Sequence, residues 1–313
     1  MSPQPDTAGA AGRADPEQVR TGLSGDLTDL TDLTDQVIAS FAGASAPRYR
    51  EIMQTLVRHL HAFAREVQLT NAEWEHGIDV LTRAGQLTDD RRQEFILLSD
   101  VLGLSMLTVG INAVASAGAT ESTVLGPFFV ADAPEVPAGG YLAGEAKGQP
   151  CHVSGTIRGT DGMPVAGARI EVWQADADGC YDVQYPGGRT AGRGQLRAGQ
   201  AGEYRFWSVR PAPYPIPQDG PAGDLLAAAG RGPMRPAHLH VKVQAAGYRT
   251  LVTHMFVAGD PYLDTDAVFG VKDSLIAEFA EQPPGPGPEG RHLDGPWTSV
   301  TFDIMLARQP EEP

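Results

Sequence analysis

The chain has 313 residues and a formal net charge of −15. Nucleic acids and anionic membrane surfaces repel such a field, so neither is an expected partner. Hydrophobic residues make up 42% of the chain, enough for one large core or two modest ones, and 37 glycines with 25 prolines suit a turn-rich β domain.

Residues 1–25 are rich in Ala, Gly, Pro and Asp without periodicity, which predicts a disordered tail. They contain no apolar signal segment, so we expect the protein in the cytoplasm, where Cys151 and Cys180 stay free thiols. The repeated Asp-Leu-Thr triplets of residues 26–34 are a low-complexity duplication leading into a helix, with a docking segment as the alternative.

Three helices are predicted next. Apolar residues follow helical spacing over residues 47–69, and Thr70 with Glu73 forms a capping box that opens a second helix. A third is predicted for residues 89–115; the uncharged run 101–120 is diluted by Ser, Thr, Asn and Gly, so we expect a buried helix and no membrane span. Residues 26–125 thus form a helical domain.

Short alternating runs separated by turn residues fill the rest of the chain, residues 126–313, after a break at Gly126 and Pro127. The runs are residues 152–158, 168–174, 204–209, 239–243, 251–257 and 300–306. Their number and spacing indicate a β-sandwich. The predicted fold class is therefore α+β, with an N-terminal helical domain followed by a mainly antiparallel β-sandwich.

One of these runs carries a candidate metal pair. Leu239, Val241 and Val243 alternate onto one face of the strand, so His238 and His240 leave the other face together, close enough to share an ion. The alternative is a pair of satisfied histidines on a polar face. The pair alone does not decide between them.

Two tyrosines in turn-rich settings precede the histidines. Tyr181 ends a Trp-x5-Gly-x-Tyr pattern that starts at Trp173, and Tyr214 stands between two prolines. In this order and spacing, over most of residues 45–310, the motifs resemble the intradiol ring-cleaving dioxygenases. The resemblance implies one Fe(III) per chain, held by the ligands Tyr181, Tyr214, His238 and His240. Two phenolates suit this hard cation, while Tyr185 and Tyr204 are the rival tyrosines.

The same resemblance implies the reaction. An aromatic diol and O2 would be the substrates, Tyr214 would be displaced and take up a substrate proton, and the catalytic guanidinium of Arg235 would stabilise negative charge on the ring. A Fe(II) or zinc oxygenase of the cupin kind is an alternative, although it would use a carboxylate in place of the tyrosines. A non-enzymatic transthyretin-like binding sandwich is the remote alternative.

Within the family, the chain resembles the hydroxyquinol-cleaving branch, with catechol or chlorocatechol as alternative substrates. His254 stands where catechol enzymes usually carry glutamine. The predicted substrate pocket consists of His76, Asp79, Val124, Leu125, Gly126, Pro127, Phe128 and His254. Asp79 would accept a hydrogen bond from the third hydroxyl of hydroxyquinol, the alternative being a solvated helix-surface carboxylate. The resemblance further implies a homodimer joined through the helical domain, which can enclose a bound lipid.

Overall fold

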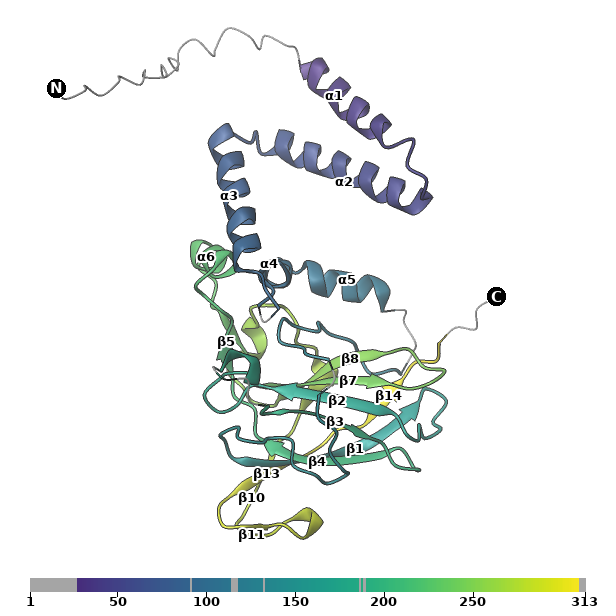
Figure 1. The fold of residues 1–313 in the computed structure, drawn as a ribbon, viewed down its shortest axis with the longest axis vertical. Helices are drawn as coiled ribbons and strands as arrows, with labels where there is room; N and C mark the ends of the chain where they lie inside the picture. The colour runs from purple at the N-terminus through teal and green to yellow at the C-terminus, as the bar shows by residue number, and fades with distance from the viewer. Residues whose placement is uncertain are drawn as a thin grey trace, which may run out of the picture. The chain divides into compact units, whose positions relative to one another are not determined.

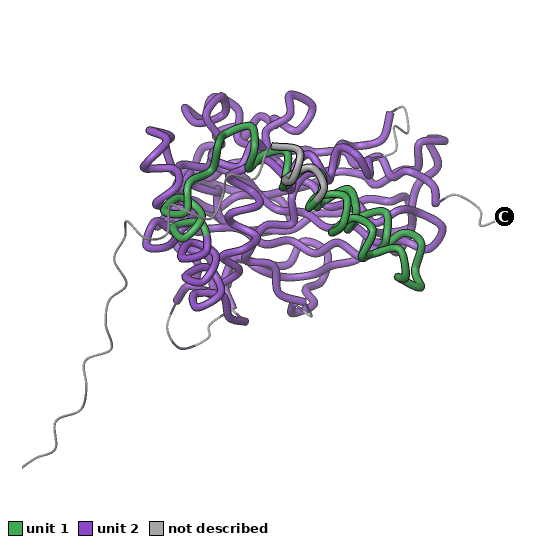
Figure 2. Tube along the Cα trace, turned by 90° about the horizontal axis from the view of Figure 1, so that it is seen from above, with its two compact units in different colours: residues 1–77 green, residues 78–313 purple. Residues whose placement is uncertain are grey.

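The computed structural model describes residues 27–90, 92–113, 118–131, 133–185, 187 and 190–309. The tail predicted to be disordered, residues 1–25, lies outside these ranges. By its internal contacts the chain divides into two compact units, residues 1–77 and 78–313 (Figure 2).

Unit 1 contains α1 (Leu27–Ser40), α2 (Pro47–Glu66) and the start of α3 (Asn71–Leu87) (Figure 1). The helix predicted for residues 47–69 is therefore confirmed, and the triplet repeat does lead into a helix. The hydroxyl of Thr34 joins α1 to α2, because it accepts a hydrogen bond of 2.8 Å from Arg65 Nη1. The outer side of α2 exposes an apolar row at helical spacing: Ile52, Leu56, Leu60, Phe63 and, just after the helix, Val67.

The start of α3 is fixed by the predicted capping box. The Thr70 amide donates to Glu73 Oε2 at 2.9 Å, and the Glu73 amide donates to Thr70 Oγ1 at 3.3 Å. Both bonds satisfy amides that the first turn of a helix leaves without intrahelical partners.

The prediction of one helix over residues 89–115 is wrong. Two helices occur there, α4 (Glu94–Val101) and α5 (Leu104–Asn112), bent by 78° at Gly103, whose φ of 74° is left-handed. Glycine adopts this left-handed conformation without steric cost, whereas a residue inside a continuous helix would not adopt it. The expected burial is wrong for α5 as well, since Leu104, Leu107 and Ile111 are exposed. In the described part of the chain no single helix could cross a membrane, while the bent pair α4–α5 passes on length and composition.

Unit 2 is built on two five-stranded sheets (Figure 1). The first contains β10 (Ala280–Gln282), β13 (Trp297–Thr301), β1 (Pro150–Gly159), β14 (Ile304–Leu306) and β4 (Glu203–Val209). The second runs in the order β3 (Arg193–Arg197), β2 (Arg169–Gln174), β7 (His238–Gln244), β8 (Leu251–Val257) and β9 (Ile276–Ala277). Parallel pairs occur at β1–β13, β1–β14 and β8–β9, and the other pairs in these two sheets are antiparallel. The predicted α+β class is confirmed.

Short elements complete the unit. They are β5 (Tyr214–Pro215), β6 (Met234–Arg235), β11 (Gly285–Pro286), β12 (His292–Leu293), the helix α6 (Pro221–Ala228) and the 3₁₀ turns Asp182–Gln184, Leu263–Thr265, Asp273–Leu275 and Pro288–Gly290. The pairing of β5 with β6 places Tyr214 opposite Arg235. A second apolar cluster joins α4 to α6 through Leu97, Leu98 and Leu226.

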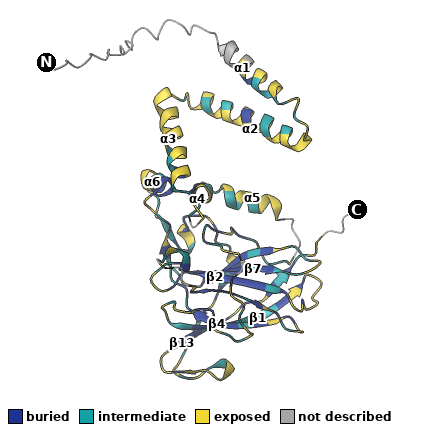
Figure 3. Cartoon of the chain, in the orientation of Figure 1, coloured by how far each residue is buried: buried dark blue, intermediate teal, exposed yellow. Residues whose placement is uncertain are grey.

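The main core lies between the two sheets (Figure 3). Val153 and Phe206 from the first sheet meet Val172, Leu239 and Val241 from the second, and all five are buried. Because side chains alternate along β7, the residues between its core positions must point to the other face of the sheet. That outer face carries His238 and His240, and it is covered by loops rather than open to solvent.

Candidate metal centre

The two histidines of β7 form one half of a buried cluster. Each is 1% exposed, and their Nε2 atoms lie 3.2 Å apart. His238 donates its Nδ1–H to the carbonyl oxygen of Pro236 at 2.6 Å, because a carbonyl can only accept. The lone pair of His238 is therefore on Nε2, directed at the cluster.

Tyr181 reaches the cluster from a tight loop. Gly179 occupies the left-handed region with φ 76°, and the Tyr181 amide donates to Gln184 Oε1 at 2.8 Å. A buried ion pair anchors the next residue, since Arg193 Nη2 lies 2.6 Å from the carboxylate of Asp182. As a result, the Tyr181 hydroxyl lies 2.9 Å from His240 Nε2.

Tyr214 closes the cluster from β5. Its hydroxyl accepts a hydrogen bond from that of Tyr181 at 3.1 Å. Two phenol oxygens and two imidazole nitrogens from three separate chain segments thus converge, in the combination that the family resemblance implies. The rival tyrosines are engaged elsewhere: Tyr185 donates to Asp176 at 2.8 Å, and Tyr204 donates to the carbonyl of Phe302.

The electrostatics of the cluster suit a cation. Burial raises the pKa of Tyr181 well above its ordinary value, and the neighbouring Tyr214 raises it further. Burial and the charge of Arg235 lower the pKa of His238 to about 3. The protein alone therefore holds two neutral phenols and two neutral imidazoles, and a bound hard cation would convert the phenols to phenolates. This donor set fits ferric iron.

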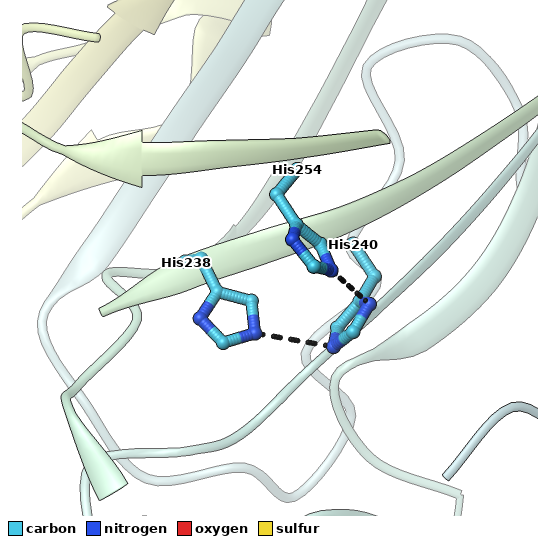
Figure 4. Close-up of side chains that lie close together, drawn as sticks. All are labelled: His238, His240 and His254. Carbon is cyan, nitrogen blue, oxygen red and sulfur yellow. Dashed lines mark hydrogen bonds between the residues drawn. The ribbon is translucent and has the colours of Figure 1, made fainter. Parts of the chain in front are cut away.

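His254 makes the cluster larger (Figure 4). Its Nε2 lies 2.8 Å from His240 Nδ1, and one nitrogen from each of His238, His240 and His254 can be chosen within 4.8 Å of the others. A three-histidine site is therefore the geometric alternative. However, His254 contacts the nitrogen on the far edge of the His240 ring, away from Tyr181, so it adjoins the four-donor cluster without facing its centre.

Arg235 lies beside the cluster and is 2% exposed. Its Nη1 is 3.2 Å from His238 Nε2 and 3.5 Å from the Tyr214 hydroxyl. Burial alone would lower the pKa of Arg235, but the carboxylate of Asp266 raises it above its ordinary value, so the guanidinium stays charged. The sequence analysis missed Asp266, because the stretch around it offers no pattern that distinguishes it from the exposed Asp264.

The predicted pocket turn, residues 124–128, lies against the cluster. A Cβ on Gly126 would lie 3.1 Å from Cε1 of His240, and the Phe128 ring stacks on Tyr181 with centroids 4.6 Å apart. Val124 is buried, Pro127 is half-buried, and Leu125 is 39% exposed. Leu125 lines a separate cleft of about 860 Å³ that includes Tyr248, Arg249 and Lys272.

Asp79, the carboxylate predicted for the substrate pocket, is exposed, whereas a different carboxylate, that of Asp100, is buried. His76 and Asp79 are both exposed on α3. Asp100 on α4 is instead 2% exposed, its Oδ1 has no partner among the described residues, and burial raises its pKa to about 6. The charges of Arg235 and Asp266 act on that pKa, so Asp100 lies near them. The sequence signal that could have identified Asp100 is a single acidic residue within an apolar helical run.

Comparison with known proteins agrees with this geometry. The family model described as "Catechol dioxygenase N terminus" matches residues 46–120, and the one described as "Dioxygenase" matches residues 124–307. A hydroxyquinol 1,2-dioxygenase of Rhodococcus opacus is 61% identical over 88% of this chain and 92% of its own, and one of Nocardioides simplex is 60% identical over 87% and 93%. A solved hydroxyquinol 1,2-dioxygenase of Pseudomonas putida DLL-E4 superposes with a TM-score of 0.81 at 43% identity, covering 91% of this chain and 100% of that one. The chain therefore belongs to the intradiol ring-cleavage dioxygenase family.

Proposed function

We propose that this enzyme is an Fe(III)-dependent intradiol dioxygenase that cleaves hydroxyquinol with O2 to 3-hydroxy-cis,cis-muconate, which tautomerises to maleylacetate. The convergence of the Tyr181 and Tyr214 hydroxyls with the Nε2 atoms of His238 and His240 carries the reaction class. The relatives at 60% and 61% identity, both named hydroxyquinol 1,2-dioxygenase, carry the substrate. Catechol and chlorocatechol remain the alternative substrates.

The metal assignment rests on the donor set. Tyr181, Tyr214, His238 and His240 would hold one iron per chain, in a site from which the loops exclude water. When bound, ferric iron supplies the chemistry that makes an electron-rich diolate ring open to attack by O2 at carbon. The protein's task is to bind, orient and deprotonate the diol.

Tyr214 and Arg235 are placed for that task. We assign Tyr214 as the base that takes a proton from a substrate hydroxyl, because a bound metal would leave it deprotonated. Burial raises the pKa of Tyr214, and the charge of Arg235, whose Nη1 lies 3.5 Å from its oxygen, offsets part of that rise. The fixed guanidinium also stabilises negative charge that develops on the ring. Asp266 holds it in position through hydrogen bonds to Nε and Nη2.

Asp100, rather than the exposed Asp79, has the surroundings of a specificity residue. Its Oδ1 is buried without a partner, although buried carboxylate oxygens are normally hydrogen-bonded. Ser105 hydrogen-bonds to the Asp100 carboxylate, so only Oδ1 lacks a donor. A third hydroxyl on the ring would supply that donor, whereas catechol would leave Oδ1 unpaired. Sites built around such a bond discriminate strongly against analogues that lack it.

The exposed apolar row of α2 bears on the oligomeric state. We propose that the row formed by Ile52, Leu56, Leu60, Phe63 and Val67 joins two chains into a homodimer and can cover a lipid, because single exposed helices do not keep such a stripe in water. Light scattering of the purified protein would measure the subunit number.

Cys151 and Cys180 are free thiols. We propose a cytoplasmic location, because a reducing compartment keeps thiols in this state.

The test of the function is direct. Iron-loaded protein is offered hydroxyquinol, catechol and 4-chlorocatechol in parallel, while O2 uptake and the absorption of the ring-opened acid are recorded. One O2 consumed per hydroxyquinol, with a specificity constant above that for catechol, supports the proposal. Equal or faster catechol cleavage would reject the substrate but keep the reaction class, and a zinc-dependent or Fe(II)-dependent activity would reject both.

A further inference from the structure

We propose that His254 is a positioning residue that accepts the Nδ1–H of His240 and thereby fixes the ring of this metal ligand. The inference rests on the iron site proposed above and concerns a residue outside its four donors. It also assigns a structural reason to a histidine at this position of β8 (Figure 4).

The sheet register brings the two rings together. His240 of β7 stands directly opposite His254 of β8 in an antiparallel pair, so both side chains leave the same face. Their ring centroids are 4.2 Å apart with the planes at 84°, and His240 Nδ1 lies 2.8 Å from His254 Nε2. Both rings are at most 1% exposed, so water does not compete for this hydrogen bond.

Only one proton lies between these two nitrogens. If His254 donated it, the proton of the neutral His240 ring would sit on Nε2 and face Tyr181, which would block the lone pair that a metal needs. If His240 donates it, Nε2 is free and His254 Nε2 is the acceptor. Metal binding therefore requires the second arrangement, in which an acceptor on the far edge of the ring orients the ligand.

The two histidine ligands meet this requirement by different means. His238 donates its Nδ1–H to the backbone carbonyl of Pro236, which no side-chain substitution removes. His240 has His254 in that role instead. Trp173 stacks flat on the His240 ring, with centroids 4.7 Å apart and planes at 14°, so it restricts the tilt of the ring while His254 restricts its rotation.

The surroundings of His254 show what the acceptor must be. Its other nitrogen, Nδ1, is buried without a partner among the described residues and lies beside Gly270. The position therefore calls for one acceptor toward His240 and tolerates a donor on the other side. Glutamine meets both conditions with its carbonyl and amide groups, while leucine fills space but accepts nothing.

The experiment compares His254→Gln and His254→Leu with the wild type and with Met255→Leu, which lies on the opposite, core-facing side of β8. Each protein is loaded with Fe(III), and iron release to a chelator is followed together with the phenolate-to-iron absorption band. We expect His254→Leu to release iron about 10- to 100-fold faster, the range for loss of such an outer partner. His254→Gln and Met255→Leu should stay close to the wild type.

Two results would overturn the inference: His254→Leu retaining iron as firmly as the wild type, or His254→Gln losing it as fast as His254→Leu. Folding of each variant is checked by its unfolding transition, and the glutamine variant decides the matter if the leucine variant does not fold. A wild-type protein that binds no iron would reject the proposed function as well, so the two failures are distinguishable.

Discussion

The buried guanidinium of Arg235 donates two hydrogen bonds to Asp266, from Nε to Oδ1 at 3.1 Å and from Nη2 to Oδ2 at 3.4 Å. The same carboxylate accepts the amide of Gly270 at 2.9 Å. Asp266 thus holds the guanidinium through Nε and Nη2, while Nη1 is directed toward the Tyr214 hydroxyl and His238 Nε2. The position of the charge that we assign to catalysis therefore depends on Asp266, which has no hydrogen bond to any of the four donors among the described residues.

The first prediction concerns this pair. Asp266→Asn should lower kcat about 10- to 100-fold while iron content stays unchanged, because the guanidinium loses its charged partner and its fixed direction. The free energy of unfolding should fall by about 3 kcal/mol, since a buried ion pair loses one partner. Iron analysis, steady-state kinetics and urea unfolding measure the three quantities.

The exposed Asp264 lies two residues away and provides the matched control. Asp264→Asn should leave kcat and stability near those of the wild type. If Asp266→Asn turns over at the normal rate, Arg235 does not need this partner, and its role in orienting the charge is rejected.

The second prediction separates the two tyrosines. Tyr214→Phe should keep iron and part of its visible absorption but turn over slowly, because the residue assigned as the proton acceptor is gone. Tyr181→Phe should weaken iron binding itself, since Tyr181 is in hydrogen-bond contact with His240 and its loop is anchored by Asp182 and Arg193. Normal turnover of Tyr214→Phe would remove Tyr214 from the proton transfer.

Local patterns made much of this architecture predictable. The alternation of Leu239, Val241 and Val243 fixes the face of β7 that carries the histidines, and the Thr70–Glu73 capping box fixes the start of α3. Each of these signals lies within a few residues of the feature that it specifies. Tyr181 and Tyr214, in contrast, were assigned through family resemblance, because spacing alone does not bring two distant turns to one point.

The features that the sequence did not predict depend on long-range contacts. Gly103 breaks the third helix, although an isolated glycine in a helical pattern is often tolerated. Asp79 and Asp100 both stand on helices, and only the packing of α4 against α6 shows that Asp100 is the buried one. His254 was predicted as a pocket residue, whereas its contact with His240 follows from strand register.

The third prediction tests the source of substrate preference. Asp100→Asn should lower the specificity constant for hydroxyquinol roughly tenfold to a hundredfold, because a hydrogen bond to a charged acceptor is worth about 1.5 to 3 kcal/mol. The constant for catechol should change much less, since catechol offers no third hydroxyl. Asp79→Asn is the matched control and should alter neither constant. If Asp79→Asn lowered the specificity constant for hydroxyquinol and Asp100→Asn did not, the specificity residue would be Asp79 on α3 and not Asp100.

The last prediction follows from the electrostatic cost of Asp100. Burial raises its pKa from 3.8 to about 6, so the folded protein binds this proton more tightly than the unfolded chain does. Stability is therefore lost as the pH rises from about 4 to about 6, and at 1.4 kcal/mol per pKa unit the cost at pH 7 is about 3 kcal/mol. Asp100→Asn removes the charge, so it should be more stable than the wild type by up to that amount at pH 7 and by about half of it at pH 5. Urea unfolding at both pH values measures the difference, with the exposed Asp79→Asn expected to stay within about 0.5 kcal/mol of the wild type. A variant that is stabilised at pH 7 and yet loses hydroxyquinol specificity would show that the carboxylate is kept for binding at the expense of stability. If the variant and the wild type were equally stable at both pH values, burial would not raise the pKa of Asp100 in the folded protein, and the prediction would be wrong.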